Sequence, residues 1–587
     1  MASDEAVLLG DEAIALGAVH AGLGAAYGYP GTPSTEILEY LIKLFEAGKG
    51  PRAAWCANEK TAYEEALGAS FSGRRVLVTM KHVGLNVAAD PFVNSALVAI
   101  KGGLVLAVAD DPGMHSSQDE QDSRFYAEFA MIPCLEPTDQ EEAYEMTREA
   151  FDLSERFQVP VMIRITTRLA HSRAGVRTRT PRAANPLGKT TDKAAWTLLP
   201  ANARRRYDRL CSIQGELEAW SIASPWNVSA ASPWNVSAAS PWNAERATAT
   251  AAKADFAVIT GGLGRNYFEE NLADLKAKLG EDKLPPRLHI GGYPLPAAKI
   301  RELAAANKRI LVIEEGAPLI EKAVRGILSS GVEVSGKLDG RLPRSGELNP
   351  DNVRAALALP PRPSAKLDMP PLPNRPPQLC QGCPHADSYS AVAKAVEGLP
   401  LSAIFADIGC YALGALPPFN VPEALVCMGA SIGMAIGAAE AGYEHVVAFI
   451  GDSTFLHSGL TPLVDAVSRN APVTIVILDN SIVAMTGGQP TILPSSRLEE
   501  IVKGIGVDPA HVATIDASRA AAERNVEIFR REIAYRGVSV VIARRECLEA
   551  IKAKKKKGAR TAGSGDAGRA GAAAAAIEAA CAPEEAE

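Results

Sequence analysis

The chain has 587 residues, of which 47% are hydrophobic and 22% are charged. This composition supports a large buried core and, at this length, about three or four domains. The formal net charge of −7 argues against nucleic acid and anionic membranes as partners, because both select basic surfaces. We therefore expect neither.

The N-terminus and the cysteine content indicate a cytoplasmic protein. The opening "MASDEAVLLGDEAIALG" carries acids where a secretory signal carries bases, and the longest apolar stretch is interrupted by Asn94 and Lys101. The nine cysteines are scattered and lack the spacing of a secreted disulfide framework. In a reducing compartment, an organised subset of them indicates metal binding or redox chemistry.

Alternating helical patterns and short apolar runs indicate an α/β protein. In the first part of the chain such runs occur at residues 74–80, 102–111 and 159–167, which is typical of a parallel sheet covered by helices on both faces. The pattern resumes after residue 255 and again after a Pro-rich stretch. We expect an α/β domain at 1–190, a linker at 191–250, a smaller α/β domain at 251–345, a Pro-rich linker at 346–378, a second large α/β domain at 379–550 and a low-complexity tail at 551–587.

An eight-residue unit, SPWNVSAA, occurs two and a half times between Ser224 and Asn243. Its period is too short for a solenoid unit, and Ser-Pro turns at this spacing cannot build a core alone. We expect an inserted loop or linker, with contact to a partner as the alternative.

Two apolar strands of the last large domain end in polar turns. One is followed by Gly451-Asp452 and the next by Asp479-Asn480. Ligands of α/β folds bind at the carboxyl ends of neighbouring strands. Glycine lets the backbone approach a diphosphate, and carboxylate, amide and carbonyl oxygens are the ligands that Mg²⁺ prefers. The alternative is two unrelated turns.

The spacing of these turns resembles the thiamine diphosphate (ThDP) motif, in which GD and a third residue precede an Asn by about 25 residues. Two departures stand out, since Asp479 replaces the first Asn of the usual pair and the third residue is Ser rather than Gly. The resemblance assigns Mg²⁺ to Asp452, Asn480 and the backbone carbonyl of Ile482. It assigns the cofactor to Gly451, Asp452, Ser453, Asn480 and Ile482.

ThDP enzymes need a second domain, whose glutamate hydrogen-bonds the aminopyrimidine ring and shifts its tautomer. The segment "NEKTAYEEALGASFSG" at residues 58–73 resembles the helix that carries this glutamate, and Glu59 would be the catalytic residue. The alternative for Glu59 is an ordinary residue at a helix N-terminus. The presence of both half-motifs in one chain favours the catalytic interpretation.

Further segments point to one family: GYPGTPSTEI (28–37), MKHVGLNVAADPF (80–92), HSSQDEQDSR (115–124), CQGCPH (380–385), DIGCYALGALPP (407–418), CMGASIGMA (427–435) and MTGGQP (485–490). Together they resemble the large, alpha-type subunits of indolepyruvate:ferredoxin oxidoreductases, within the ThDP-dependent 2-oxoacid:ferredoxin oxidoreductases. The resemblance covers roughly residues 5–550. It implies two doubly wound ThDP-binding-type α/β domains, of pyrimidine and diphosphate type, with a smaller transketolase-C-terminal-like α/β domain between them.

The family's activity is the oxidative decarboxylation of an aryl pyruvate, such as indolepyruvate, to an arylacetyl-CoA with electrons passed to ferredoxin. By this resemblance Thr32, in a YPxTPS element, would contact the substrate carboxylate, although PGTPS is also favourable turn chemistry. His385 is placed at the cofactor as an acid-base or ring-stacking candidate, and His82 is a second candidate. For both histidines a satisfied place in the core is the favoured alternative.

Cys380, Cys383, Cys410 and Cys547 follow the order in which the wider superfamily holds a [4Fe-4S] cluster next to ThDP. A two-electron oxidation that feeds a one-electron carrier needs such an exit. The alternatives are a structural zinc site and four unrelated thiols.

One departure concerns the C-terminus. Large subunits of the family usually end in a ferredoxin-like domain with two runs of CxxCxxCxxxCP, whereas Cys581 alone follows Cys547 here. We expect electrons to leave through a separate small (beta/gamma-type) subunit or directly to ferredoxin or another carrier. A homodimer of this chain within a heterotetramer is the expected assembly.

Two rival functions stay open. One is a non-oxidative ThDP decarboxylase, which has no use for the four cysteines, and the other is a non-catalytic scaffold subunit.

Overall fold

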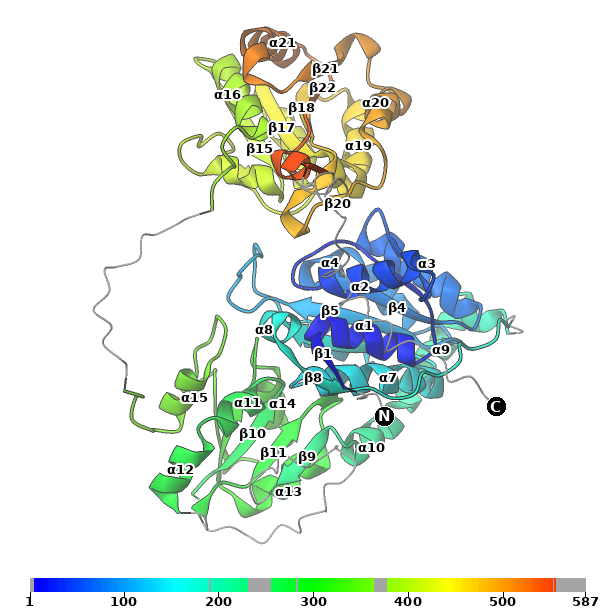
Figure 1. The fold of residues 1–587 in the computed structure, drawn as a ribbon, viewed down its shortest axis with the longest axis vertical. Coiled ribbons are helices and arrows are strands. Elements are labelled where there is room, and N and C mark those ends of the chain that lie inside the picture. The colour runs from blue at the N-terminus through cyan, green and yellow to red at the C-terminus, as the bar shows by residue number, and fades with distance from the viewer. Residues whose placement is uncertain are drawn as a thin grey trace, which may run out of the picture. The chain divides into compact units, whose positions relative to one another are not determined.

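The computed structural model describes residues 5–188, 192–230, 255–280, 283–363, 377–552 and 554–555. Contacts divide the chain near residue 366 into an N-terminal unit and a C-terminal unit (Figure 1). The second and third SPWN copies, the centre of the Pro-rich linker and the tail from residue 556 lie outside the described residues. Among the helices that the structure describes, none combines the length and the apolar run that a bilayer crossing requires.

The N-terminal unit begins with a seven-stranded sheet of order β12-β6-β7-β5-β4-β2-β3, in which only the edge strand β12 is antiparallel to its neighbour. Every residue of β4, β5 and β7 is buried, which explains their continuous apolar sequences. A separate antiparallel pair joins β1 (Glu5–Leu9) to β8 (Arg173–Arg177). The sheet strands are β2 (Leu23–Gly28), β3 (Arg52–Trp55), β4 (Arg75–Lys81), β5 (Leu104–Asp110), β6 (Cys134–Leu135), β7 (Val161–Thr166) and β12 (Gly292–Tyr293).

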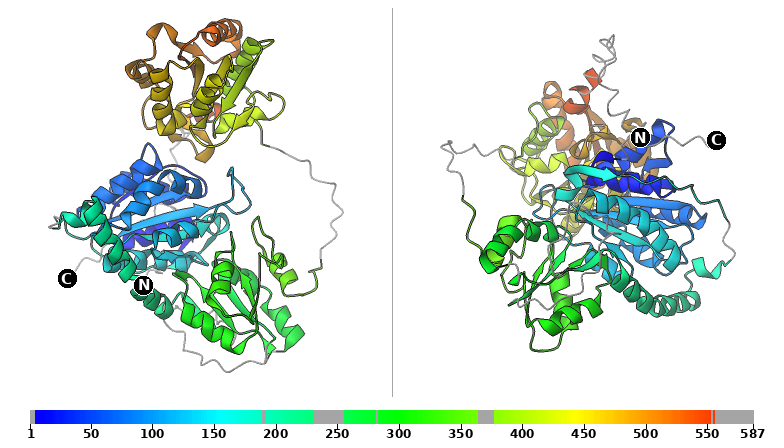
Figure 2. Two further views of the ribbon diagram at one scale, coloured as in Figure 1. Left: turned by 180° about the vertical axis from the view of Figure 1, so that it is seen from behind. Right: turned by 60° about the horizontal axis from the view of Figure 1, so that its bottom comes forward.

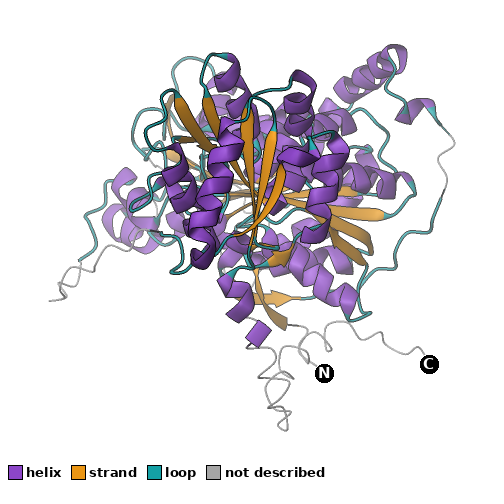
Figure 3. Ribbon diagram, turned by 90° about the horizontal axis from the view of Figure 1, so that it is seen from above, coloured by secondary structure: helices purple, strands orange, loops and turns teal. Residues whose placement is uncertain are grey.

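Helices pack against this sheet, and the view coloured by secondary structure shows strands flanked by helices (Figure 3). Strand and helix alternate along the chain, so each parallel strand ends in a turn that leads into a helix. The helices are α1 (Gly10–His20), α2 (Thr35–Glu46), α3 (Glu59–Phe71), α4 (His82–Val87), α5 (Ala89–Ser95), α6 (Arg124–Ala130), α7 (Gln140–Phe157) and α8 (Thr167–His171).

A five-stranded sheet of order β14-β13-β10-β11-β9 completes the N-terminal unit, with β9 as an antiparallel edge strand (Figure 2). Its strands are β9 (Asn227–Ala230), β10 (Ala257–Gly261), β11 (Arg287–Ile290), β13 (Arg309–Ile313) and β14 (Glu333–Ser335). Its helices are α11 (Gly264–Glu269), α12 (Leu272–Leu279), α13 (Ala297–Ala306), α14 (Leu319–Ile327) and α15 (Pro350–Ala356). Helix α15 lies in the segment that the sequence analysis expected to be a linker.

Buried ion pairs connect the two sheets of the N-terminal unit. The guanidinium of Arg164 donates to Asp110 at 2.7 Å and also pairs with Glu136. Arg124 lies 3.0 Å from Glu314, which directly follows β13. All of these side chains are almost fully buried. Removal of one partner would leave an uncompensated charge in the interior, so the network fixes how the two sheets pack.

The predicted linker at 191–250 contains ordered structure in its described part. Helices α9 (Pro200–Ser212) and α10 (Gln214–Ala223) lead directly into the first SPWN copy. The indole of Trp226 is 2% exposed and donates to Glu149 at 2.6 Å. Asn227 donates from Nδ2 to the carbonyl of Gly292 at 2.8 Å and accepts from the N–H of Gly291 at 3.0 Å. The first copy is therefore part of the sheet and its core, in contrast to the loop expected for the whole repeat.

The C-terminal unit contains a six-stranded, wholly parallel sheet of order β16-β15-β17-β18-β22-β21. The chain passes from β15 to β16 on one side and then to β17 on the other side of β15, so the carboxyl ends of β15 and β17 form a switch point where such folds bind ligands. The strands are β15 (Ser402–Ala406), β16 (Ala424–Leu425), β17 (His445–Gly451), β18 (Val473–Asp479), β21 (Val512–Asp516) and β22 (Ser539–Arg544). A short hairpin joins β19 (Ile482–Val483) to β20 (Gln489–Pro490).

Helices surround this sheet, and two of them begin at positions that matter for the site. Helix α16 starts directly after Cys383, and α18 starts at Asp452. The helices are α16 (Pro384–Val396), α17 (Ala430–Glu440), α18 (Asp452–Thr454), α19 (Leu460–Arg469), α20 (Leu498–Ile505) and α21 (Ala522–Ala534).

We predict that Trp226→Ala lowers the stability of the protein by about 3–5 kcal/mol, since it removes a buried indole and the hydrogen bond to Glu149. The measurement is the midpoint of thermal unfolding of the full chain. Trp234→Ala is the matched control, because Trp234 has the same SPWN context in the second copy. If the first copy alone fills this position, the control keeps the wild-type midpoint. Equal losses in both variants would contradict the assignment.

Candidate functional site

The carboxylate of Asp452 joins the turns that follow β17 and β18. These strands are parallel neighbours with Gly451 opposite Leu478, so both turns leave the sheet at the same edge. Asp452 is 4% exposed, and its Oδ2 accepts from the backbone N–H groups of Ser481 at 2.7 Å and Asn480 at 3.2 Å. The side chain therefore fixes the second turn against the first.

Burial raises the pKa of Asp452 to about 7, while backbone N–H donors lower it and the nearby Asp479 raises it. Asp479 itself accepts from Arg544 of β22 at 2.7 Å. This pairing gives the aspartate at position 479 a structural role beside the strand. A buried carboxylate with no cation of its own is a suitable ligand for a divalent ion, which would compensate its charge.

Asn480 is held by a buried histidine. Its Nδ2 lies 3.2 Å from Nε2 of His385, and its Oδ1 accepts from the N–H of Ile482 at 3.1 Å. Burial lowers the pKa of His385 to about 4, so the ring is neutral at pH 7 and can accept from the amide. Asp452 and Asn480 thus bring carboxylate and amide oxygens, the donor types that Mg²⁺ prefers, to two adjacent turns.

Gly451 allows a close approach between the ends of β15 and β17. A Cβ at this position would lie 2.7 Å from Cε1 of Tyr411, in the turn after β15. The side chain of Tyr411 is buried. The backbone carbonyl of Tyr411 accepts a hydrogen bond from the hydroxyl of Tyr389 at 2.8 Å. Sequence reasoning missed Tyr411, and the only signal for it was its place beside Cys410 in DIGCY.

The four predicted cluster cysteines lie around the same edge of the C-terminal sheet. The N–H of Cys383 donates to the carbonyl of Cys380 at 3.0 Å, and that of Cys547 donates to the carbonyl of Asn480 at 3.4 Å. Burial and the other three thiols raise the pKa of Cys410 to about 12. The thiols of Cys380, Cys383 and Cys547 therefore lie close enough to Cys410 to influence its pKa.

In the N-terminal unit, Glu59 is the first residue of α3 and is 5% exposed. The side chain of Asn58 caps the helix by accepting from the N–H of Thr61 at 2.8 Å. A Cβ on Gly84 of α4 would lie 2.6 Å from Oε1 of Glu59. The carboxylate therefore lies directly against α4, at a position that only glycine leaves open.

Thr32 lies close to a buried lysine that sequence reasoning missed. The hydroxyl of Ser116 donates to the carbonyl of Thr32 at 3.3 Å, and Nζ of Lys81 donates to the carbonyl of Ser116 at 2.7 Å. Burial lowers the pKa of Lys81 to about 8, against the opposing effects of Asp111 and Asp119. The only signal in the sequence was a lysine at the end of a continuous apolar strand.

The other histidine candidate, His82, directly follows Lys81 and is 1% exposed. Its Nε2 lies 3.4 Å from Oδ1 of Asp119. Lys81 ends β4 and His82 begins the next helix, while Thr32 follows β2 and Glu59 begins the helix after β3. All four therefore lie at the carboxyl edge of the seven-stranded sheet.

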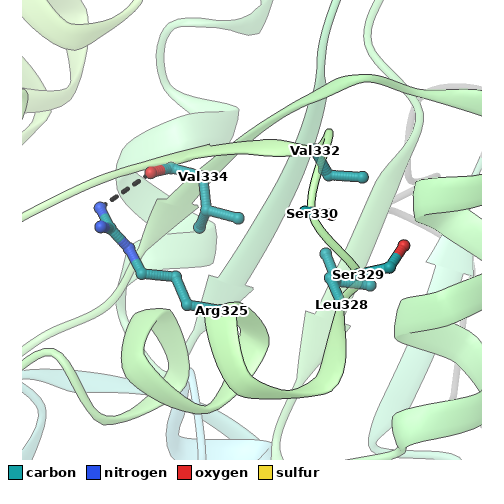
Figure 4. Close-up of a pocket in the computed structure, with 6 residues that line it drawn as sticks. All are labelled: Arg325, Leu328, Ser329, Ser330, Val332 and Val334. Atoms are coloured by element: carbon teal, nitrogen blue, oxygen red, sulfur yellow. Dashed lines mark hydrogen bonds between the residues drawn. The ribbon is translucent and has the colours of Figure 1, made fainter.

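A surface pocket of about 220 Å³ lies elsewhere, at the end of α14 and beside the edge strand β14 (Figure 4). Arg325 points to the backbone of β14 and donates to the carbonyl of Val334 at 2.9 Å. None of the predicted site residues lines this pocket.

Comparisons with known proteins cover nearly the whole chain. Residues 16–207 match the family described as "Pyruvate flavodoxin/ferredoxin oxidoreductase, thiamine diP-bdg", and residues 407–543 match "Thiamine pyrophosphate enzyme, C-terminal TPP binding domain". The chain is 38% identical over 570 residues to indolepyruvate oxidoreductase subunit IorA of Methanothermobacter thermautotrophicus, with coverage of 93% of this chain and 87% of that protein. The corresponding protein of Archaeoglobus fulgidus is 36% identical over 554 residues, with coverage of 88% and 82%. A solved 2-oxoglutarate:ferredoxin oxidoreductase from Magnetococcus marinus gives a TM-score of 0.47 at 17% identity, covering 60% of this chain and 66% of that one.

We predict that Gly84→Ala displaces the Glu59 side chain and lowers the midpoint of thermal unfolding, because the new Cβ would overlap the carboxylate. Gly68→Ala is the matched control. Gly68 lies inside α3, and a Cβ there would have no neighbour within 4 Å. Replacement of a helical glycine by alanine stabilises by about 0.5–1 kcal/mol, so the control should unfold at a higher temperature than the wild type. A Gly84→Ala protein as stable as this control would contradict the contact.

Proposed function

Because the chain belongs to the family of the IorA subunits of indolepyruvate oxidoreductases, we propose that it is the catalytic, ThDP-binding subunit of a 2-oxoacid oxidoreductase. The reaction is the oxidative decarboxylation of an aryl pyruvate such as indolepyruvate, with CoA as acyl acceptor and ferredoxin or another carrier as electron acceptor. The observation that carries the proposal is the buried Asp452–Asn480 turn pair, together with Cys410 and the three thiols of Cys380, Cys383 and Cys547 that act on its pKa.

The proposed magnesium ligands are Asp452, Asn480 and the carbonyl of Ile482, and the diphosphate would approach the backbone of Gly451 and Ser453. Support comes from the donor chemistry and from the position of these turns at the carboxyl ends of neighbouring parallel strands. His385 has a positioning role in the proposal, because its neutral ring accepts from the amide of Asn480 and leaves the amide oxygen as the donor atom. When bound, ThDP supplies the group that accepts the electron pair released as a 2-oxoacid loses CO₂.

Glu59 is the proposed partner of the aminopyrimidine ring. Its carboxyl group is nearly excluded from water, and a carboxyl group in such a place can share a proton with a ring nitrogen. Gly84 and the Asn58 cap fix the start of α3, so the position of the carboxylate is set by backbone packing. We therefore assign Glu59 to holding and moving the proton that activates the cofactor.

Lys81 and Thr32 are the proposed contacts for the substrate carboxylate. A lysine held through Ser116 beside Thr32 places a cation and a hydroxyl-bearing residue at one location. Lys81 is 7% exposed, so its ammonium is poorly solvated and gains more from a bound carboxylate than a surface lysine would. The preference for an aryl side chain rests on the family relationship.

Cys380, Cys383, Cys410 and Cys547 are the proposed ligands of a [4Fe-4S] cluster. The pKa values of Cys383 and Cys410 are raised, so a metal that takes the place of the proton would favour their thiolate forms. The iron and sulfide content measured below separates the cluster from the zinc alternative.

The grouping of the cysteines also bears on the rival functions. A non-oxidative ThDP decarboxylase would need Glu59, Asp452 and Asn480 but no electron exit beside them. A scaffold subunit would need neither. The hydrogen bond from the N–H of Cys547 to the carbonyl of Asn480 supports the oxidative function, because an electron exit has to lie beside the cofactor. A small beta/gamma-type subunit and a homodimer of this chain within a heterotetramer complete the proposed assembly.

We expect protein purified without oxygen to contain about four iron and four sulfide per chain, as a [4Fe-4S] cluster requires. Cys547→Ala should lose this content and the electron paramagnetic resonance signal seen after reduction, while it still binds ThDP. Cys427→Ala is the control, since Cys427 is exposed in the same unit and lies outside the group. Anaerobic protein that binds ThDP but contains no iron would refute the oxidative function and support the non-oxidative decarboxylase.

We also predict that kcat/KM for the 2-oxoacid falls as the pH rises through about 8, because Lys81 loses its proton there and no longer attracts a carboxylate. Asp111 and Asp119 are the charged groups that act on Lys81, and both favour its charged form. Lys81→Arg should move this loss to higher pH, since an arginine keeps its charge. Lys81→Met should raise KM more than it lowers kcat. An unchanged alkaline limb in both variants would remove Lys81 from substrate binding.

A further inference from the structure

A second group of ligand-type side chains lies in the N-terminal unit, away from the residues assigned above. Asp11 is in the first turn of α1, Glu36 is in the first turn of α2, and His171 is the last residue of α8. One carboxylate oxygen from each acid and one ring nitrogen of the histidine all lie within 4.8 Å of one another. Three elements that are distant in sequence thus present one ligand atom each to the same point.

Asp11 has no other role among the described residues. The residue is 0% exposed, and neither of its carboxylate oxygens has a hydrogen-bond partner. A buried acid without donors is costly, because nothing replaces the water that its charge would bind. Such a group needs either a proton or a cation.

The backbone brings these side chains together. A Cβ on Gly10 would lie 2.3 Å from the carbonyl oxygen of Leu169, so the glycine allows the start of α1 to touch α8. Asp11 directly follows this contact, and His171 lies two residues beyond Leu169. The close contact between α1 and α8 is made by backbone atoms. It therefore does not depend on the side chains of Asp11, Glu36 and His171.

The group combines one buried and two accessible members. Nε2 of His171 lies 3.5 Å from Oε2 of Glu36, and the two side chains are 36% and 38% exposed. An ion could therefore enter from the side of Glu36 and His171 and reach Asp11 behind them. The three ligand atoms lie within 4.8 Å of one another, and both accessible side chains can change rotamer to approach the roughly 3.4 Å between ligands of a tetrahedral ion with bonds of about 2.1 Å.

We propose that Asp11, Glu36 and His171 bind one divalent transition-metal ion, preferably Zn²⁺, and that this ion ties α1, α2 and α8 together. One imidazole and two carboxylates with a position left for water form a typical zinc ligand set, whereas Mg²⁺ prefers oxygen ligands alone. The ion would supply the positive charge that the oxygens of Asp11 lack. Thr32 lies in the turn between β2 and α2. An ion that holds the first turn of α2 would therefore also hold the end of the turn that carries Thr32.

The test is a titration of the full chain, freed of loosely bound metal and supplied with Mg²⁺ and ThDP, with Co²⁺ as a coloured substitute for Zn²⁺. A site with one nitrogen and two oxygen ligands gives visible d–d bands without a thiolate charge-transfer band, which separates it from any cobalt on the cysteines. We expect one such equivalent per chain, displaced by Zn²⁺, and a rise in the unfolding midpoint on Zn²⁺ addition.

Asp11→Asn keeps the shape of the side chain, and His171→Gln changes an accessible position that the fold tolerates. Each should weaken Co²⁺ binding at least tenfold and remove the Zn²⁺-dependent rise in the midpoint. Glu39→Gln, on the same helix as Glu36, is the matched control and should behave as the wild type. Absence of non-thiolate cobalt bands in the wild type, or bands that persist in both variants, would overturn the proposal. A metal-free Asp11→Asn protein that unfolds at a higher temperature, with no binding by the wild type, would show that Asp11 holds a proton instead.

Discussion

The hydrogen bonds from the backbone of Asn480 and Ser481 to the carboxylate of Asp452 are the constraint on which the C-terminal site depends. Parallel pairing of β17 with β18 only brings two turns to one edge of the sheet. The carboxylate then fixes the distance between them. Asn480 in turn accepts through its own carbonyl from Cys547, so the last cysteine takes its position from the same contact.

In the N-terminal unit, the candidate site residues are positioned by glycines. At each of these positions the absence of a Cβ allows the backbone to approach a neighbouring side chain closely. Gly84 leaves room for the carboxylate of Glu59, and Gly31 comes within 3.0 Å of Lys81 at the position a Cβ would occupy. Gly10 does the same for α1 against α8. In both units the functional groups follow parallel strands, where the backbone leaves the sheet and side chains from different strands converge.

Sequence reasoning was most successful where the physics is local. Buried parallel strands appear as continuous apolar runs, so the positions of β4, β5, β7, β17 and β18 and the turns after the last two could be predicted. It failed where the answer depends on a distant partner. Nothing local marks Trp226 as a core residue, because the same SPWN letters surround Trp234, and its burial follows from packing against Glu149. Lys81 resembles a solvated lysine until the fold buries it, and Asp11 meets His171 only through the contact of α1 with α8.

The shared position of Asn480 has a consequence for how the C-terminal site is assembled. Its side chain is held by His385, its N–H by Asp452, and its carbonyl accepts from Cys547. The pKa values of Asp452 and Cys410 are both raised, so each group would lose its proton more readily beside a bound cation. A cation at Asp452 and a metal cluster at the cysteines would each favour the charged form of their own ligands, and both would act on the position of Asn480. Binding at the two places would therefore be linked through the backbone of this asparagine.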